Sequence, residues 1–133
     1  MFFKNKLLII SALVLLPTLY FFVTYSNKSN ASINLSTTNN SVLNNGKQIY
    51  AQNCASCHGI NLEGQKDWKS RLPNGMMPAP PHDSTGHTWH HPDRYLFMVT
   101  KYGIEELIGE KYPNNMPAYK DILSDEEIIA VLS

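Results

Sequence analysis

The chain has 133 residues, of which 43% are hydrophobic and 17% are charged, and its formal net charge is zero. This length predicts one domain and an additional segment. Beyond residue 41 the chain has eight Lys and Arg residues and 11 Asp and Glu residues, a formal net charge of −3. This acidic balance argues against nucleic acid and against an anionic lipid surface as partners, because both attract basic proteins.

The additional segment is an apolar run near the N-terminus. Residues 7–25 form a stretch of 19 residues without a charged side chain, which is about long enough to cross a bilayer. Lys4 and Lys6 precede this run, and basic residues favour the cytoplasmic side. A cleaved signal peptide is the alternative, but its apolar core is usually only about 7 to 15 residues long and ends at a small-x-small site. We therefore expect a single-pass helix in the cytoplasmic membrane, with the following domain on the periplasmic side.

The next stretch, residues 26–41, is rich in Ser, Asn and Thr and nearly free of apolar side chains. This composition is typical of a flexible tether. The sequence thus predicts three parts: an N-terminal membrane anchor or signal sequence at 1–25, a flexible linker at 26–41, and one domain at 42–133.

Residues 42–53 show helical spacing and predict a helix that leads into Cys54. Cys54 and Cys57 are the chain's two cysteines, and His58 directly follows the second. This Cys-x-x-Cys-His pattern is typical of c-type haem attachment: each thiol can add to one vinyl group, and His58 can bind the iron. A thioredoxin-like redox pair or a zinc site would be alternatives, but no strand precedes Cys54 and the other histidines lie too far downstream.

The pattern Gly46-x-x-x-Tyr50-x-x-x-Cys54-x-x-Cys57-His58 resembles the N-terminal helix and haem site of single-haem, class I c-type cytochromes. The resemblance implies an all-α fold, a small cytochrome c-like helical domain wrapped around one covalently bound haem c. It also implies that Gly46 lets the first helix cross closely against the C-terminal helix, with Tyr50 packed in the same crossing.

Residues 59–91 hold most of the glycines and prolines and predict loops that wrap the haem. Within them lie four histidines in ten residues: His82, His87, His90 and His91. One interpretation is a polar loop that hydrogen-bonds haem propionates and neighbouring backbone. Another is a copper or zinc site, or a docking surface for a copper protein, because histidine clusters are metal-binding signals.

A second helix is predicted from Pro92, at its first position, to Gly103, which ends it. Residues 104–112 predict at most a short helical turn, broken by Gly109. A capping box at 124–127 opens the C-terminal helix, which stops several residues short of the usual family ending.

Met116, followed by Pro117, resembles the family's segment that carries the sixth iron ligand. The resemblance thus implies iron ligation by His58 and Met116, and a thioether ligand raises the reduction potential. Met76, Met77 and Met98 compete for this role, and Met116 could instead serve only in core packing.

With both axial positions filled, the iron has no place for a substrate. The predicted function is therefore not enzymatic: a membrane-tethered electron carrier between redox proteins of a respiratory chain or a dehydrogenase. One alternative is a peroxidase-like haem protein with an open iron site. Another is a copper-handling protein that uses the histidine-rich loop.

Overall fold

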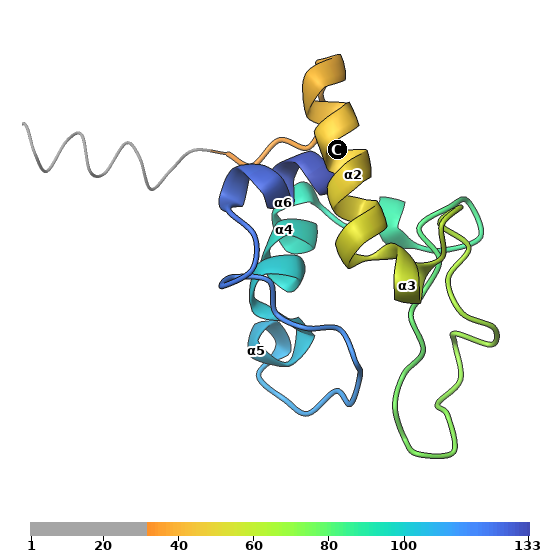
Figure 1. Ribbon diagram of the computed structural model, residues 1–133. Coiled ribbons are helices and arrows are strands. Elements are labelled where there is room, and N and C mark those ends of the chain that lie inside the picture. The colour runs from red at the N-terminus through yellow and green to blue at the C-terminus, as the bar shows by residue number, and fades with distance from the viewer. Residues whose placement is uncertain (1–31) are drawn as a thin grey trace, which may run out of the picture. The chain divides into compact units, whose positions relative to one another are not determined.

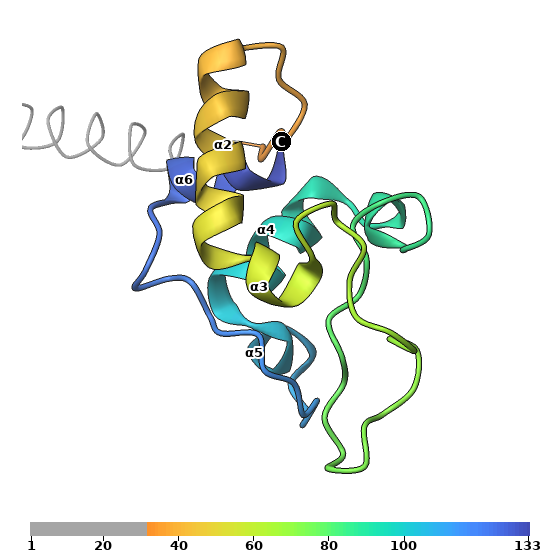
Figure 2. The ribbon, with the colours of Figure 1, turned by 45° about the vertical axis from the view of Figure 1, so that its right-hand side comes forward.

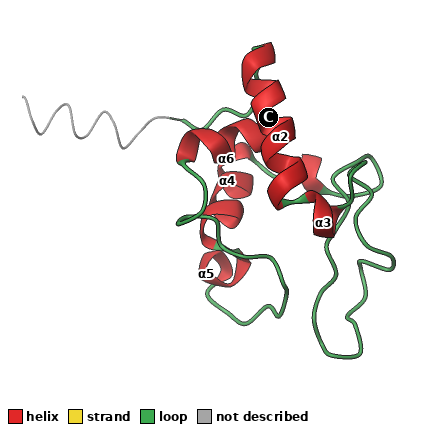
Figure 3. Cartoon of the chain, in the orientation of Figure 1, coloured by secondary structure: helices red, strands yellow, loops and turns green. Residues whose placement is uncertain are grey.

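The computed structural model describes residues 32–133, and the domain considered below runs from Ile33 to Ser133. Its helices, joined by loops, are drawn in Figures 1 and 3; they are α2 (Asn40–Asn53), α3 (Ala55–His58), the 3₁₀ helix η1 (Thr88–His90), α4 (Asp93–Tyr102), α5 (Ile104–Ile108) and α6 (Asp125–Leu132). In this part of the chain there is no strand, only an isolated bridge between Met77 and Asn114. The prediction of an all-α domain is confirmed for these residues.

The predicted membrane anchor at 1–25 lies outside the described residues, as do the first six residues of the predicted linker. Over residues 32–133 no helix is both long and apolar enough to cross a membrane.

Helices α2 and α6 cross each other closely, as Figure 2 shows. The crossing point is Gly46, which is buried, and a Cβ added there would overlap the backbone carbonyl of Ala130. Only glycine permits this approach, because any side chain would push the two backbones apart. The role that the sequence predicted for Gly46 is confirmed.

The core lies where α4 and the segment before α6 meet α6. Phe97, Tyr119 and Ile128 form its buried cluster, with Ile128 fully buried. α6 begins at the predicted capping box: the Glu127 N–H donates to Ser124 Oγ (3.2 Å), and the Ser124 N–H donates to Glu127 Oε2 (2.8 Å). The box satisfies N–H groups that have no partner within the helix.

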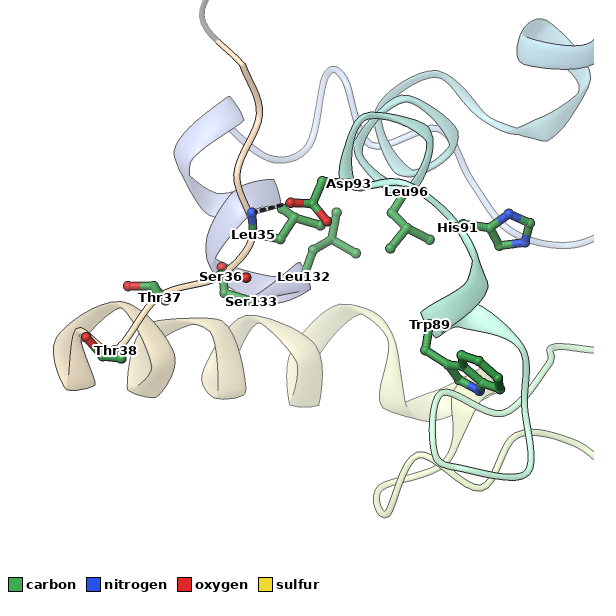
Figure 4. A pocket seen from close by; sticks show the side chains of 10 residues that line it. All are labelled: Leu35, Ser36, Thr37, Thr38, Trp89, His91, Asp93, Leu96, Leu132 and Ser133. Atoms are coloured by element: carbon green, nitrogen blue, oxygen red, sulfur yellow. Dashed lines mark hydrogen bonds between the residues drawn. The ribbon is translucent and has the colours of Figure 1, made fainter.

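The segment before α2 packs against the domain. The Leu35 side chain is buried, and its backbone N–H donates to the Asp93 carboxylate at 2.9 Å, the dashed line in Figure 4. The Asn39 side chain then caps α2, which begins at Asn40. Within the range predicted as a flexible linker, the structure thus buries Leu35, and α2 begins at Asn40, two residues before the predicted start of the domain.

The ends of α4 agree with the sequence to within one residue, whereas the short helices α3 and η1 were not predicted. Pro92 is the N-cap of α4, and Asp93 is its first helical residue. α5 ends at Gly109, whose backbone is left-handed (φ 70°, ψ 17°), as the sequence predicts for a helix-ending glycine.

The α2–α6 crossing predicts that Gly46→Ala destabilises the folded protein. Alanine favours a helix over glycine, but the added methyl meets a backbone carbonyl that cannot move aside alone, so we expect a net loss of about 1–3 kcal/mol in the free energy of unfolding. Denaturant-induced unfolding measures this loss. Asn45→Ala, at an exposed position in α2, is the matched control and should cause no loss; equal stability of the two variants would contradict the close crossing.

Candidate functional site

The two cysteines lie on a single tight turn after the first helix. α2 ends at Asn53, and α3 begins directly after Cys54. The N–H groups of Cys57 and His58 both donate to the Cys54 carbonyl, at 3.1 and 2.9 Å. Both thiols are free; Cys54 is partly buried and Cys57 is exposed. A spacing of three residues on one helical turn brings two side chains to the same side, so the thiols can react with one planar group.

The His58 imidazole is buried, with 8% of its surface exposed, and its Nδ1 lies 2.9 Å from the carbonyl oxygen of Pro80. A carbonyl oxygen can only accept a hydrogen bond, so Nδ1 carries the proton and donates it. The lone pair of the neutral ring is therefore on Nε2. Metal-binding histidines are oriented by this kind of hydrogen bond from the other ring nitrogen.

The chain that carries Pro80 is held against the loop that follows His58. The Gly64 N–H donates to the His58 carbonyl at 2.7 Å, and the His82 N–H donates to the Leu62 carbonyl at 2.8 Å. A Cβ on Gly64 would overlap the backbone of Pro81, so the two chain segments touch without an intervening side chain. The acceptor for His58 is thus fixed by backbone contacts.

Two tyrosines hold the backbone on either side of the cysteine turn. The Tyr50 hydroxyl donates to the Gly59 carbonyl and the Tyr119 hydroxyl donates to the Asn53 carbonyl, each at 2.8 Å. Burial raises the pKa of both tyrosines to about 12, so their hydroxyls stay protonated as donors at neutral pH. The resemblance placed Tyr50 in the helix crossing; its hydrogen bond to the turn is an additional role.

His82 lies directly beside His58. The two rings stack, with centroids 4.2 Å apart and an angle of 23° between their planes. His82 Nδ1 is 2.7 Å from Thr88 Oγ1, within hydrogen-bond distance. Burial, together with the positive charges that His58 and His87 could carry, lowers the pKa of His82 to about 4, so this ring is neutral at neutral pH.

The other three histidines of the predicted cluster contact three different aromatic rings. His87 stacks on Trp68, His90 on Trp89 and His91 on Tyr95, with centroid distances of 5.1, 3.5 and 4.5 Å in that order. Among residues 32–133 there is no group of three or more His, Cys, Asp or Glu side chains that could hold a metal ion. The structure does not gather His82, His87, His90 and His91 into the copper site that the sequence suggested.

Met116 lies in a turn in which its N–H donates to Asn114 Oδ1 at 2.8 Å, and 36% of its surface is exposed. The competing Met77 is close to the same turn, because its N–H donates to the Pro113 carbonyl at 2.8 Å and it forms the bridge to Asn114. Met98, in contrast, packs against the buried core cluster. The fold thus brings two candidate thioether residues, Met77 and Met116, into neighbouring segments.

The domain also has an open groove between the segment before α2, η1, α4 and the end of α6, shown in Figure 4. Its volume is about 560 Å³, and Leu35, Leu96 and Leu132 are among the residues that line it. Neither the cysteines nor His58 or Met116 lines this groove.

The residues at the cysteine turn fit a covalently attached haem. Two free thiols lie three residues apart, and the next residue is a buried imidazole whose Nε2 is available to a metal because Nδ1 donates to Pro80. This donor set matches the chemistry of thioether formation and axial nitrogen ligation.

Sequence reasoning missed three contributors to this site: the Pro80 carbonyl, the Tyr119 hydroxyl and the stacking of His82 on His58. The glycines and prolines of residues 59–91 predicted loops, but the sequence did not show which backbone carbonyl would accept the hydrogen bond from His58. Tyr119 follows the Met-Pro pair closely, and that position was the only available signal.

Comparisons with known proteins agree with this geometry. The family model described as "Cytochrome c" matches residues 43–133. The chain is 34% identical over 75 residues to Cytochrome c-555 of Prosthecochloris aestuarii; the aligned part covers 52% of this chain and 76% of that relative. No solved structure gives a significant match.

The burial of the two tyrosines predicts that both ionise late in an alkaline titration of the haem-loaded protein. Tyrosine ordinarily ionises near pH 10, and a raised pKa means that the folded state holds the proton longer. Burial is the largest cause of the raised pKa and persists when haem is attached, so the stability contributed by these groups is complete below pH 10 and decreases as the pH rises above 10. In an ultraviolet titration, Tyr50→Phe and Tyr119→Phe should each remove one late-ionising group. When the unmodified protein is unfolded in denaturant, both of these groups should ionise at lower pH. Loss of an early-ionising group in either variant would contradict this.

Proposed function

This chain belongs to the cytochrome c family, and on that premise we propose that it is a single-electron carrier whose haem c is bound through Cys54, Cys57 and His58. Haem c is the covalently attached cofactor of this family, and when bound it supplies an iron that alternates between ferric and ferrous states. The proposal assigns both thiols to the thioether bonds and His58 Nε2 to the iron.

The observation that carries this assignment is the hydrogen bond from His58 Nδ1 to the Pro80 carbonyl. It selects the tautomer with a free Nε2, and the residue as a whole is buried. A charge-neutral, hydrogen-bonded imidazole is the form that binds a metal.

We assign the sixth iron ligand to the Met116 thioether. Support comes from the Asn114 turn, which orders the backbone of Met116, and from Pro117, which restricts the residue before it. Exposure of part of the Met116 side chain leaves its sulfur free of core packing, unlike Met98. Met77 is the main competitor because the bridge to Asn114 places it beside this turn.

Two protein ligands that stay in place in both oxidation states suit electron transfer. The His58 side is held by backbone contacts between two loops, so little rearrangement of the chain accompanies a change of charge. Such a site leaves no open position for a substrate. If Met116 instead left the iron readily, the site would be open and peroxidase-like chemistry would become the better description.

The proposed setting is the outer face of the cytoplasmic membrane. The apolar run at 7–25 and the preceding Lys4 and Lys6 support a single-pass anchor, with the haem domain in the periplasm. The proposed partners are redox proteins of a respiratory chain or a dehydrogenase. The acidic balance beyond residue 41 favours partners with a basic docking face.

The ligand assignment predicts different spectra for two methionine variants of the haem-loaded protein. Met116→Ala should abolish the weak sulfur-to-iron charge-transfer band of the oxidised protein and allow rapid carbon monoxide binding after reduction. Met77→Ala is the matched control, because it removes the neighbouring thioether, and should keep the band. The reverse pattern would assign the ligand to Met77; a native protein that lacks the band and binds carbon monoxide rapidly would favour an open iron site.

A further inference from the structure

The hydrogen bond to Pro80 does not by itself fix the direction of the His58 ring plane. The Nδ1–H···O bond and a metal bond at Nε2 both lie close to the plane of the imidazole. Together they fix the position of the ring, but they only weakly restrain its rotation about the line that joins the two contacts. A group on the face of the ring would be needed to fix the direction of its plane.

His82 occupies that face, and two contacts hold it there. Its backbone N–H donates to the Leu62 carbonyl at 2.8 Å, and its Nδ1 is 2.7 Å from Thr88 Oγ1. Its ring lies 4.2 Å from the His58 ring, centroid to centroid, with 23° between the planes. Flat rings at this separation are in face contact, and rotation of either ring would bring its edge into the other.

The segment that carries His82 has little room to move away. A Cβ on Gly64 or on Gly86 would overlap the backbone of Pro81, so the residue before His82 is enclosed by backbone on two sides. Pro80 and Pro81 also restrict the chain on their own. The acceptor for His58 Nδ1 and the ring that covers its face are thus parts of one stiff segment.

We propose that His82 is a positioning residue for His58, and that its ring, anchored at Thr88, fixes the direction of the ligand imidazole plane over the haem. This inference rests on the proposed function, because it requires that His58 bind the iron. It gives His82 a role in the haem site in place of the copper role that the histidine cluster suggested. The remaining histidines stack on Trp68, Trp89 and Tyr95 and do not share this role.

The test uses proton NMR of the oxidised, haem-loaded protein. The spread of the haem methyl resonances depends on the orientations of the axial ligands, so it responds to a change in the direction of the His58 imidazole plane. In His82→Leu, which removes the flat ring, we expect an altered spread or a second set of resonances. His82→Phe keeps a flat ring and should resemble the unmodified protein more closely, whereas Thr88→Val removes only the anchor and should give an intermediate change.

His90→Leu is the matched control, because His90 belongs to the same loop and stacks on the exposed Trp89. It should leave the methyl resonances and the reduction potential unchanged. A His82→Leu protein with resonances and potential identical to those of His90→Leu would overturn the proposal.

A measurement on the unmodified protein covers the case in which a His82 variant does not fold. In the reduced protein we expect nuclear Overhauser effects between the ring protons of His82 and His58, and their absence would overturn the stacking. The same spectrum separates this proposal from the proposed function: His58 ring protons without the large shift caused by the haem would contradict iron ligation itself.

Discussion

The hydrogen bond from His58 Nδ1 to the Pro80 carbonyl connects the two chain segments that form the proposed haem site. His58 belongs to the turn after α2, whereas Pro80 lies 22 residues further along the chain in a stiff loop. A buried imidazole without a partner for its N–H would cost about 1–3 kcal/mol. This cost favours a fold in which the loop that carries Pro80 lies beside His58. Once it does, the Nε2 lone pair is available and His82 is brought onto the face of the ring.

The helices determine where this site can form. Because Gly46 allows α2 to contact the backbone of α6, the end of α2 and the cysteine turn keep a fixed place relative to the core. Tyr119 belongs to that core cluster and also donates to the Asn53 carbonyl at the start of the turn. Tyr50 holds the other end of the turn through the Gly59 carbonyl. The thiols and the imidazole are therefore presented by a turn that is tied to the core and to α2.

The local features of this protein could be predicted from its sequence, whereas its long-range contacts could not, apart from the crossing of α2 and α6 at Gly46, which the family resemblance implied. The Cys54–His58 pattern, the capping box at Ser124 and the end of α5 at Gly109 each depend on a few neighbouring residues. The acceptor of His58 and the contact of Leu35 with Asp93 join residues 22 and 58 positions apart, so no local pattern reveals them.

The four histidines show the converse limit. Their proximity in sequence allowed a metal site as one interpretation, but each of them stacks on a different ring, and only His87 and His91 are in edge contact with each other. Met77 and Met116 are far apart in sequence, yet their segments are neighbours in the fold.

The optical spectrum of the matured protein after unfolding in alkaline pyridine tests whether Cys54, Cys57 and His58 form one covalent haem site. With both thiols bound, haem should stay with the unfolded chain and give the spectrum of two thioether bonds. Haem that separates from the chain, or the spectrum of a single thioether, would show that the two cysteines do not both bind it.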